Sequence, residues 1–200
     1  MAKPLILAST SPYKKKLLQR LNISFTCASP STNEQPLNNE QPKLLALRLA
    51  EEKALDVAKK NPETIIIGSD QVGDHKGSIL NKPGNFDQAF KQLSAQSGQT
   101  VYFHSAVSVV LAQSDCQIKK DTRLNTTKVV FNDLTRQQIE DYLNVEQPFD
   151  CAGSFKSEGL GISLFSSIES NDPTSLIGLP LIELCKILKN YDVINSNKLD

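Results

Sequence analysis

Apolar and polar residues follow two different periods along the chain. Short apolar runs predict strands, whereas longer amphipathic segments predict helices. The predicted strands cover residues 4–8, 23–28, 65–67, 100–111, part of 118–131 and 162–168, and the predicted helices cover 12–21, 43–60, 86–95, 135–145 and a last segment ending at 188. A turn at residues 113–115 predicts a hairpin between the two longest strands. We therefore expect one α/β domain over residues 1–192, followed by a polar tail at 193–200.

The segment around Asp70 is the first candidate for a functional site. Ile65, Ile66 and Ile67 form a β-branched run that ends at Gly68, which predicts a strand buried on both faces. Because such a strand has no solvent face for a carboxylate, we expect Asp70 just beyond its C-terminal end, where open α/β sheets bind ligands. Lys82 follows a Gly-rich turn that can return a cation to the same place. Alternatively, Asp70 only caps a strand in a surface loop.

A second candidate lies where the first predicted strand turns into the first helix. Ser11 is a natural N-cap and Pro12 a natural first helical residue. Ser9 adds another hydroxyl group at this helix start, where free backbone N–H groups and the helix dipole favour an anion. Lys14 and Lys15 lie in the first turns, where cations oppose the dipole, so they also suggest a bound anion. The alternative is a solvated lysine face.

Two further charged residues are candidates because of their surroundings. Lys53 lies near Ala50 and Ala54, at the edge of the apolar stripe of the helix at 43–60, and is expected to point inward. The alternative is a lysine that buries its stem and keeps its ammonium group in water. Glu34 is a carboxylate in the polar segment at 29–42, and loops of this length inside compact domains are often functional.

Composition narrows the class of ligand. The chain has 22 basic and 22 acidic residues, so no broad basic surface for duplex nucleic acid is expected. Its four cysteines are widely scattered and contain no CxxC pair, which argues against a structural zinc site. Scattered cysteines without a signal peptide predict reduced thiols in the cytoplasm. The apolar runs are too short to span a bilayer, so no membrane partner is expected and a small anionic ligand is favoured.

Four sequence blocks then occur in a characteristic order. They are LASTSP at residues 7–12, GSDQ at 68–71 with NKP at 81–83, AGSFKSEGLG at 152–161, and NDPTSLIGLPL at 171–181. Together they resemble the Maf family of nucleoside triphosphate pyrophosphatases over almost the whole chain. The resemblance implies a two-lobed α/β fold with a long mixed sheet flanked by helices and a cleft between the lobes. It also implies a cytoplasmic enzyme that uses Mg²⁺ or Mn²⁺ and splits a nucleoside triphosphate into monophosphate and pyrophosphate. A homodimer is an expectation from the family.

Within that family, three residues resemble the branch that acts on 7-methyl-GTP: Tyr13, Gln71 and Glu158. Methylation at N7 gives guanine a positive charge, which an aromatic face such as Tyr13 and a carboxylate such as Glu158 can favour. Gln71 would help to shape this pocket. The branch typically has Trp where this chain has Tyr13, and the family commonly has two arginines where Lys14 and Lys15 stand.

The resemblance and the chemistry of the side chains together predict a role for each candidate residue. Asp70 would act as the general base and would hold the metal with Glu34, although Asn33 stands where an Asp often precedes that Glu. The triphosphate would be surrounded by Lys53, Lys82, Ser9, Lys14 and Lys15. Two alternatives stay open: a pyrophosphatase for unmodified dTTP or UTP, and a nucleotide-binding regulator of cell division with little turnover.

Overall fold

The computed structural model describes residues 3–113 and 117–194. The strands in these ranges are β1 (Leu5–Leu7), β2 (Thr26–Cys27), β3 (Ile65–His75), β4 (Ser78–Leu80), β5 (Thr100–Ala112), β6 (Ile118–Phe131) and β7 (Phe165–Glu169). The α-helices are α1 (Pro12–Gln19), α2 (Pro42–Ala58), α3 (Phe86–Gln96), α4 (Arg136–Glu146) and α5 (Leu181–Lys189), and two short 3₁₀ helices are η1 (Leu160–Leu164) and η2 (Ser175–Ile177). None of the helices in these ranges combines the length and apolar character needed to cross a bilayer.

The strands form one mixed sheet in the order β2-β1-β3-β5-β6-β7, with β4 paired to β3 off this path. β1 is parallel to β2 and β3, whereas the pairs β3–β5, β5–β6 and β6–β7 are antiparallel. β5 and β6 pair with Ala112 opposite Ile118, as a hairpin requires, although residues 114–116 of its predicted turn lie outside the described residues. The long mixed sheet expected from the resemblance is therefore confirmed.

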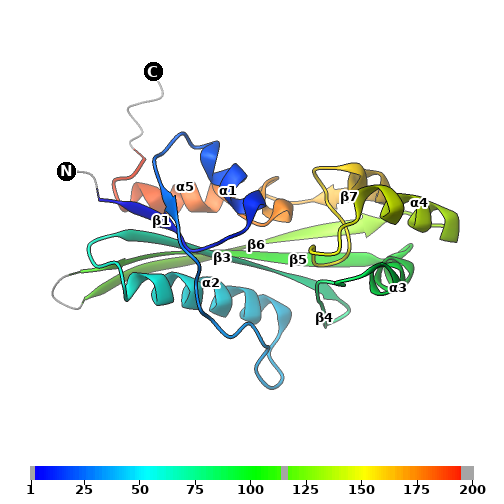
Figure 1. Ribbon diagram of the computed structural model, residues 1–200, viewed down its shortest axis with the longest axis horizontal. Helices are drawn as coiled ribbons and strands as arrows, with labels where there is room; N and C mark the ends of the chain where they lie inside the picture. Colours follow the sequence, from blue (N-terminus) through cyan, green and yellow to red (C-terminus); the bar gives the residue numbers. More distant parts are fainter. Residues whose placement is uncertain (1–2, 114–116, 195–200) are drawn as a thin grey trace.

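Helices cover both faces of the sheet at the end that holds β1 and β2. α1 and α5 lie on one face and α2 lies on the other (Figure 1). Ile65 and Ile67 pack on the first face with Leu17 of α1 and Leu184 of α5, whereas Ile66 packs on the second face against α2. Because successive strand residues point to opposite faces, this arrangement buries all three isoleucines, as the sequence predicts.

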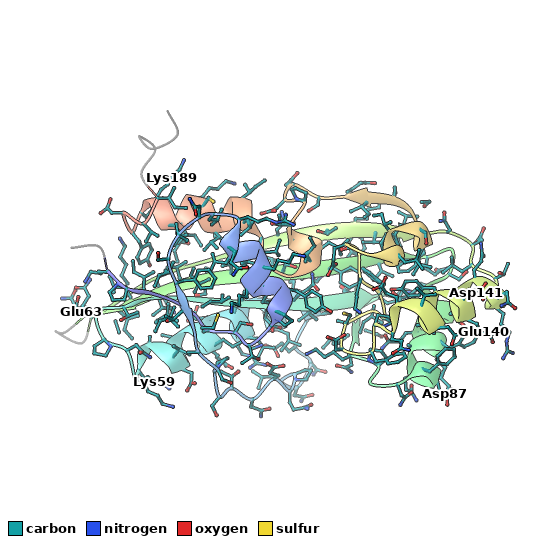
Figure 2. All side chains as sticks on the ribbon, turned by 45° about the horizontal axis from the view of Figure 1, so that its top comes forward. Lys59, Glu63, Asp87, Glu140, Asp141 and Lys189 are labelled. Atoms are coloured by element: carbon teal, nitrogen blue, oxygen red, sulfur yellow. The ribbon has the colours of Figure 1, made fainter. Side chains whose placement is uncertain are left out.

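A second lobe lies at the other end of the long strands. It contains α3 and α4 (Figure 1), and Figure 2 shows Asp87 and Asp141 of these helices far along the molecule from Lys59 and Glu63. Helix α4 begins with a capping box, in which Thr135 and Gln138 satisfy each other's backbone N–H groups. The two-lobed arrangement expected from the resemblance is therefore present.

The core of the second lobe is rich in aromatic side chains. Phe155 contacts three other phenylalanines edge to face, at ring-centroid distances of 5.1, 5.9 and 4.8 Å: Phe103, Phe131 and Phe165. Gly153 makes this packing possible, because a Cβ there would lie 2.9 Å from the Phe103 ring. Phe155 thus anchors the segment at residues 148–159 to the lobe.

Three predicted strands have different bounds in the structure. The strand expected at residues 23–28 is confined to Thr26–Cys27. β3 does not end before Asp70 but continues to His75, and Asp70 lies opposite Ala106 in the ladder with β5. The strand continues because β5 pairs with β3 far beyond the isoleucines, as far as Asp74 opposite Tyr102. Residues 160–164 form η1, so the predicted strand at 162–168 is confined to Phe165–Glu169.

Candidate active site

A cavity of about 690 Å³ opens between the lobes. Its walls come from the β1–α1 connection, α2, β3, the segment after β4, the loop at 150–158 and η2. The residues that the sequence singled out and that line it are Ser9, Tyr13, Lys14, Glu34, Lys53, Asp70, Gln71, Lys82 and Glu158. Lys15, by contrast, is exposed on α1 and lies outside the lining that the described residues form.

Lys53 joins the two carboxylates that the sequence singled out. Its Nζ lies 2.6 Å from Asp70 Oδ1 and 2.6 Å from Glu34 Oε1. Lys53 is only 8% exposed, so the prediction that it points inward is confirmed. Burial alone would lower the pKa of Lys53, but the charges and hydrogen bonds of Asp70 and Glu34 raise it above its usual value. The lysine is therefore a fixed positive charge at this end of the cavity.

Glu34 is placed by charge rather than by burial. Its side chain is 59% exposed, yet its carboxylate reaches the Lys53 ammonium group. Burial opposes its ionisation, but the hydrogen bond and charge of Lys53, together with the charges of Lys82 and Lys14, lower the pKa of Glu34 below its usual value. Glu34 is therefore an ionised carboxylate surrounded by lysines.

Lys14 extends from α1 to the same end of the cavity. Its Nζ donates a hydrogen bond of 2.6 Å to the backbone oxygen of Ser69, next to Asp70. Burial lowers the pKa of Lys14 to about 8, and the charge of Lys53 acts in the same direction while that of Asp70 opposes it. The predicted N-cap of this helix is present, since the Ser11 hydroxyl accepts from the Lys14 N–H, while Ser9 Oγ accepts from the Ser11 N–H at 3.1 Å.

Gln71 has a structural task that the sequence did not indicate. Its Nε2 donates to the backbone oxygens of Ser175 and Leu176, each at 2.9 Å, and lies 3.0 Å from Ser105 Oγ. Ser69 Oγ makes a similar bond of 3.0 Å to the Gly178 oxygen. Gln71 therefore shapes the cavity by holding η2 against the sheet.

The other end of the cavity is aromatic and acidic. Tyr13 lies there with Asp150, Cys151 and Glu158. Burial raises the pKa of Tyr13 to about 12, and the neighbouring Cys151, Asp150 and Glu158 add to this effect. Burial likewise raises the pKa of the Cys151 thiol to about 12. This end therefore holds a protonated phenol and a protonated thiol beside the side chains of Asp150 and Glu158.

Asp150 lines the cavity but was not among the candidates predicted from the sequence, where Glu158 was the one residue of this segment with an expected role. The available signal was that Asp150 lies in the same segment, PFDCAGSFKSEG, eight positions before Glu158. Lys156 also lines the cavity, but its Nζ is held by the Glu146 backbone oxygen at 3.0 Å, so its cation is tied to α4.

The residues present fit a partial site for a divalent metal ion. Asp70 and Glu34 direct their carboxylates at one point, which the Lys53 ammonium group now contacts. Oxygen ligands of this kind suit Mg²⁺, which usually takes one or two protein carboxylates and completes its shell with phosphates and water. Residues 3–113 and 117–194 contain no group of three or more His, Cys, Asp or Glu side chains that could hold a metal ion. An ion at Asp70 and Glu34 would therefore need phosphate or water oxygens as further ligands.

Comparison with known proteins agrees with this architecture. Residues 4–191 match the family model described as "Maf-like protein". The chain is 51% identical over 189 residues to a 7-methyl-GTP pyrophosphatase of Pseudoalteromonas atlantica, covering 94% of this chain and 95% of that protein. It is 45% identical over 201 residues to a protein of the same name from Idiomarina loihiensis, covering 99% and 100%. The chain therefore belongs to the family of Maf-like proteins.

Proposed function

We propose that this protein is a nucleoside triphosphate pyrophosphatase that hydrolyses 7-methyl-GTP to 7-methyl-GMP and pyrophosphate. The observation that carries the proposal is that positively charged and acidic side chains lie at opposite ends of one cavity. Lys14, Lys53 and Lys82 lie around Asp70 at one end, and Tyr13 lies with carboxylates at the other. The names of relatives at 45% and 51% identity support the same substrate.

The lysine end suits a triphosphate. Lys53 and Lys14 are held in place by hydrogen bonds to Asp70 and to the Ser69 backbone, and Lys82 is exposed at the cavity wall. A lysine binds phosphate as a point charge, so three of them can neutralise oxygens on different phosphates. Ser9 can add a hydrogen-bond donor at the start of α1.

Asp70 is the group placed to activate water. In the proposed reaction, a water oxygen forms a bond to the α-phosphorus and the bond from that phosphorus to the bridging oxygen breaks, so pyrophosphate leaves. The water proton passes to the Asp70 carboxylate, which Lys53 orients through its bond of 2.6 Å. The gain in charge at the phosphate oxygens is stabilised by the lysines that already point there.

Asp70 and Glu34 would hold Mg²⁺ or Mn²⁺ together with phosphate oxygens and water. When bound, the ion would neutralise phosphate charge and polarise the phosphoryl group. Lys53 contacts Oδ1 of Asp70 and Oε1 of Glu34, so the second oxygen of each carboxylate could ligate the ion.

The acidic end suits a base that carries a positive charge. The Tyr13 ring can lie against such a base, and a cation over an aromatic ring gains roughly 0.5–2 kcal/mol. Glu158 can accept hydrogen bonds from guanine N1–H and its amino group, and Asp150 adds a second negative charge nearby. A neutral base gains less from both carboxylates, so this end distinguishes 7-methylguanine from guanine.

The proposal is tested by measuring pyrophosphate release from 7-methyl-GTP, GTP, dTTP and UTP with Mg²⁺ or Mn²⁺. We expect 7-methyl-GTP to be the preferred substrate. Faster release from dTTP or UTP would favour the first alternative, and binding without release from any nucleotide would favour a regulator.

The proposal also includes a cytoplasmic location, a homodimeric state and the absence of duplex nucleic acid or membrane among its partners.

A further inference from the structure

Arg48 on α2 ties down the loop that carries Glu34. Its Nε lies 2.7 Å from Glu40 Oε1 and its Nη2 lies 2.8 Å from Glu40 Oε2, so the guanidinium group grips that carboxylate with two bonds. The same Nη2 lies 3.0 Å from the backbone oxygen of Gln35, the residue directly after Glu34. Nη1 faces the other way, toward Glu52 Oε2 at 3.0 Å on the same helix.

Glu40 also bonds to another residue of the loop. Its Oε2 also accepts a hydrogen bond of 2.9 Å from the Leu37 N–H, which closes the loop on itself. The Glu40 side chain is only 8% exposed and that of Arg48 is 20% exposed, so water competes weakly for this pair. On the opposite side of Glu34, the Gln35 N–H donates to Asn33 Oδ1 at 3.1 Å. The backbone on either side of Glu34 is therefore fixed.

This anchoring explains how a largely exposed carboxylate keeps one position. Glu34 lies in a segment without regular structure, and its 59% exposed side chain has little packing to hold it. Its carboxylate nevertheless meets Lys53, which lies on α2, the helix that also carries Arg48. Because one rigid helix holds both the loop backbone and the carboxylate's partner, Glu34 is presented to the phosphate end of the cavity at a set distance.

We propose that Arg48 is a positioning residue for the proposed reaction, acting through Glu34. Arg48 lies outside the cavity lining of the described residues, so it touches neither substrate nor metal directly. This role rests on the proposed function and deepens it, since it explains how the proposed metal ligand Glu34 is held in place. A side chain that supports a metal ligand in this way typically changes metal affinity or activity by roughly 10- to 100-fold when removed.

The first test compares Arg48→Gln and Glu40→Gln with the matched control Glu52→Gln. Each change alters the same guanidinium network, but only Arg48 and Glu40 contact the loop, whereas Glu52 contacts Arg48 within α2. We expect both loop variants to need roughly tenfold more Mg²⁺ for half-maximal pyrophosphate release, with the control close to wild type. Arg48→Lys should behave like Arg48→Gln, because an ammonium group keeps the charge but loses the two-pronged geometry. A wild-type Mg²⁺ requirement in Arg48→Gln would overturn the proposal.

The second test needs no activity. Hydrogen exchange of the backbone amides at residues 33–40 is measured in the protein without nucleotide or added metal. We expect faster exchange at these amides in Arg48→Gln and Glu40→Gln than in wild type or Glu52→Gln, with unchanged exchange in β3 and β5. If wild type hydrolyses none of the nucleotides, the proposed function fails while this exchange still decides whether Arg48 holds the loop. Equal exchange in all variants would refute the anchoring itself.

Discussion

Gly68 on β3 and Ala50 on α2 are in direct contact: a Cβ at Gly68 would lie 2.2 Å from the Ala50 backbone oxygen. Asp70 is two residues after Gly68 and therefore points to the same face of the strand. Lys53 is three residues after Ala50 and therefore lies on the same side of the helix. The missing side chain at Gly68 thus lets α2 approach closely enough for Lys53 and Asp70 to meet at 2.6 Å.

Gly68→Ala should therefore damage the site as well as the core. The added methyl group would overlap backbone atoms that cannot move aside alone, so α2 must shift, at a cost of about 1–3 kcal/mol. We expect this loss in urea unfolding and a larger proportional loss of pyrophosphate release. Gly73→Ala is the control, because its methyl group would meet the side chains of Leu80 and Phe103 at 3.0 and 3.1 Å, on the face away from Lys53. Equal activity in the two variants would contradict the account.

Removal of Lys53 should lower the stability of the protein, whereas removal of Lys82 should lower only its activity. Lys53→Met leaves Asp70 largely buried without its partner, which typically costs about 3–5 kcal/mol of stability. Lys82→Ala removes an exposed charge, so it should leave the melting temperature unchanged and lower kcat/KM roughly tenfold. Lys15→Ala serves as the control, since Lys15 lies outside the cavity lining. Equal kinetics for Lys82→Ala and Lys15→Ala would remove Lys82 from the phosphate site.

Lys14 should give the enzyme a pH dependence on the alkaline side. Its pKa is lowered to about 8 by burial, so its ammonium group is charged below that pH and neutral above it. We expect kcat/KM for 7-methyl-GTP to fall as pH rises through about 8, because this quantity follows the free enzyme. Lys14→Arg keeps its charge at every accessible pH and should abolish the fall. The same fall in Lys14→Arg and in the control Lys15→Arg would assign it to another group.

The acidic end of the cavity should set base preference. Tyr13→Ala, Glu158→Gln and Asp150→Asn should each lower the preference for 7-methyl-GTP over GTP, by roughly 2- to 30-fold for the aromatic residue. The control is Asp141→Asn, which removes a carboxylate from α4 in the same lobe but outside the cavity lining (Figure 2). Competition between the two nucleotides in one reaction measures the ratio directly. A preference that survives all three changes would place the methylated base elsewhere.

Local sequence signals predicted the helix starts and the buried lysine well. Ser11 and Thr135 precede good helix formers and cap them through their own side chains, so neighbouring residues contain the needed information. Lys53 could be predicted to point inward because Ala50 and Ala54 fix the orientation of its helix. The leucines of that helix gave a less reliable signal: Leu44 is 48% exposed, whereas its neighbour Leu45 and Leu49 are buried.

Features that depend on distant partners could not be predicted in this way. Asp70 was expected beyond a strand end, but pairing with β5 carries the strand past it, and that partner begins thirty positions later. Gln71 was expected to help to shape the pocket, but the sequence did not indicate that its amide group would do so by bonding to η2, over a hundred residues away. Nothing in the sequence pointed to Arg48, because its contacts with Gln35 and Glu40 depend on how the loop at residues 34–40 folds back onto α2.

The most direct measurement of the central claim is pyrophosphate release from 7-methyl-GTP and GTP by wild type and Asp70→Asn, with circular dichroism to confirm equal folding. We predict that wild type has a kcat/KM for 7-methyl-GTP roughly tenfold or more above that for GTP. Asp70→Asn should lose about a hundred- to ten-thousand-fold in rate, as expected for removal of a general base. Equal hydrolysis of GTP by wild type, or near-wild-type turnover by Asp70→Asn, would contradict the account.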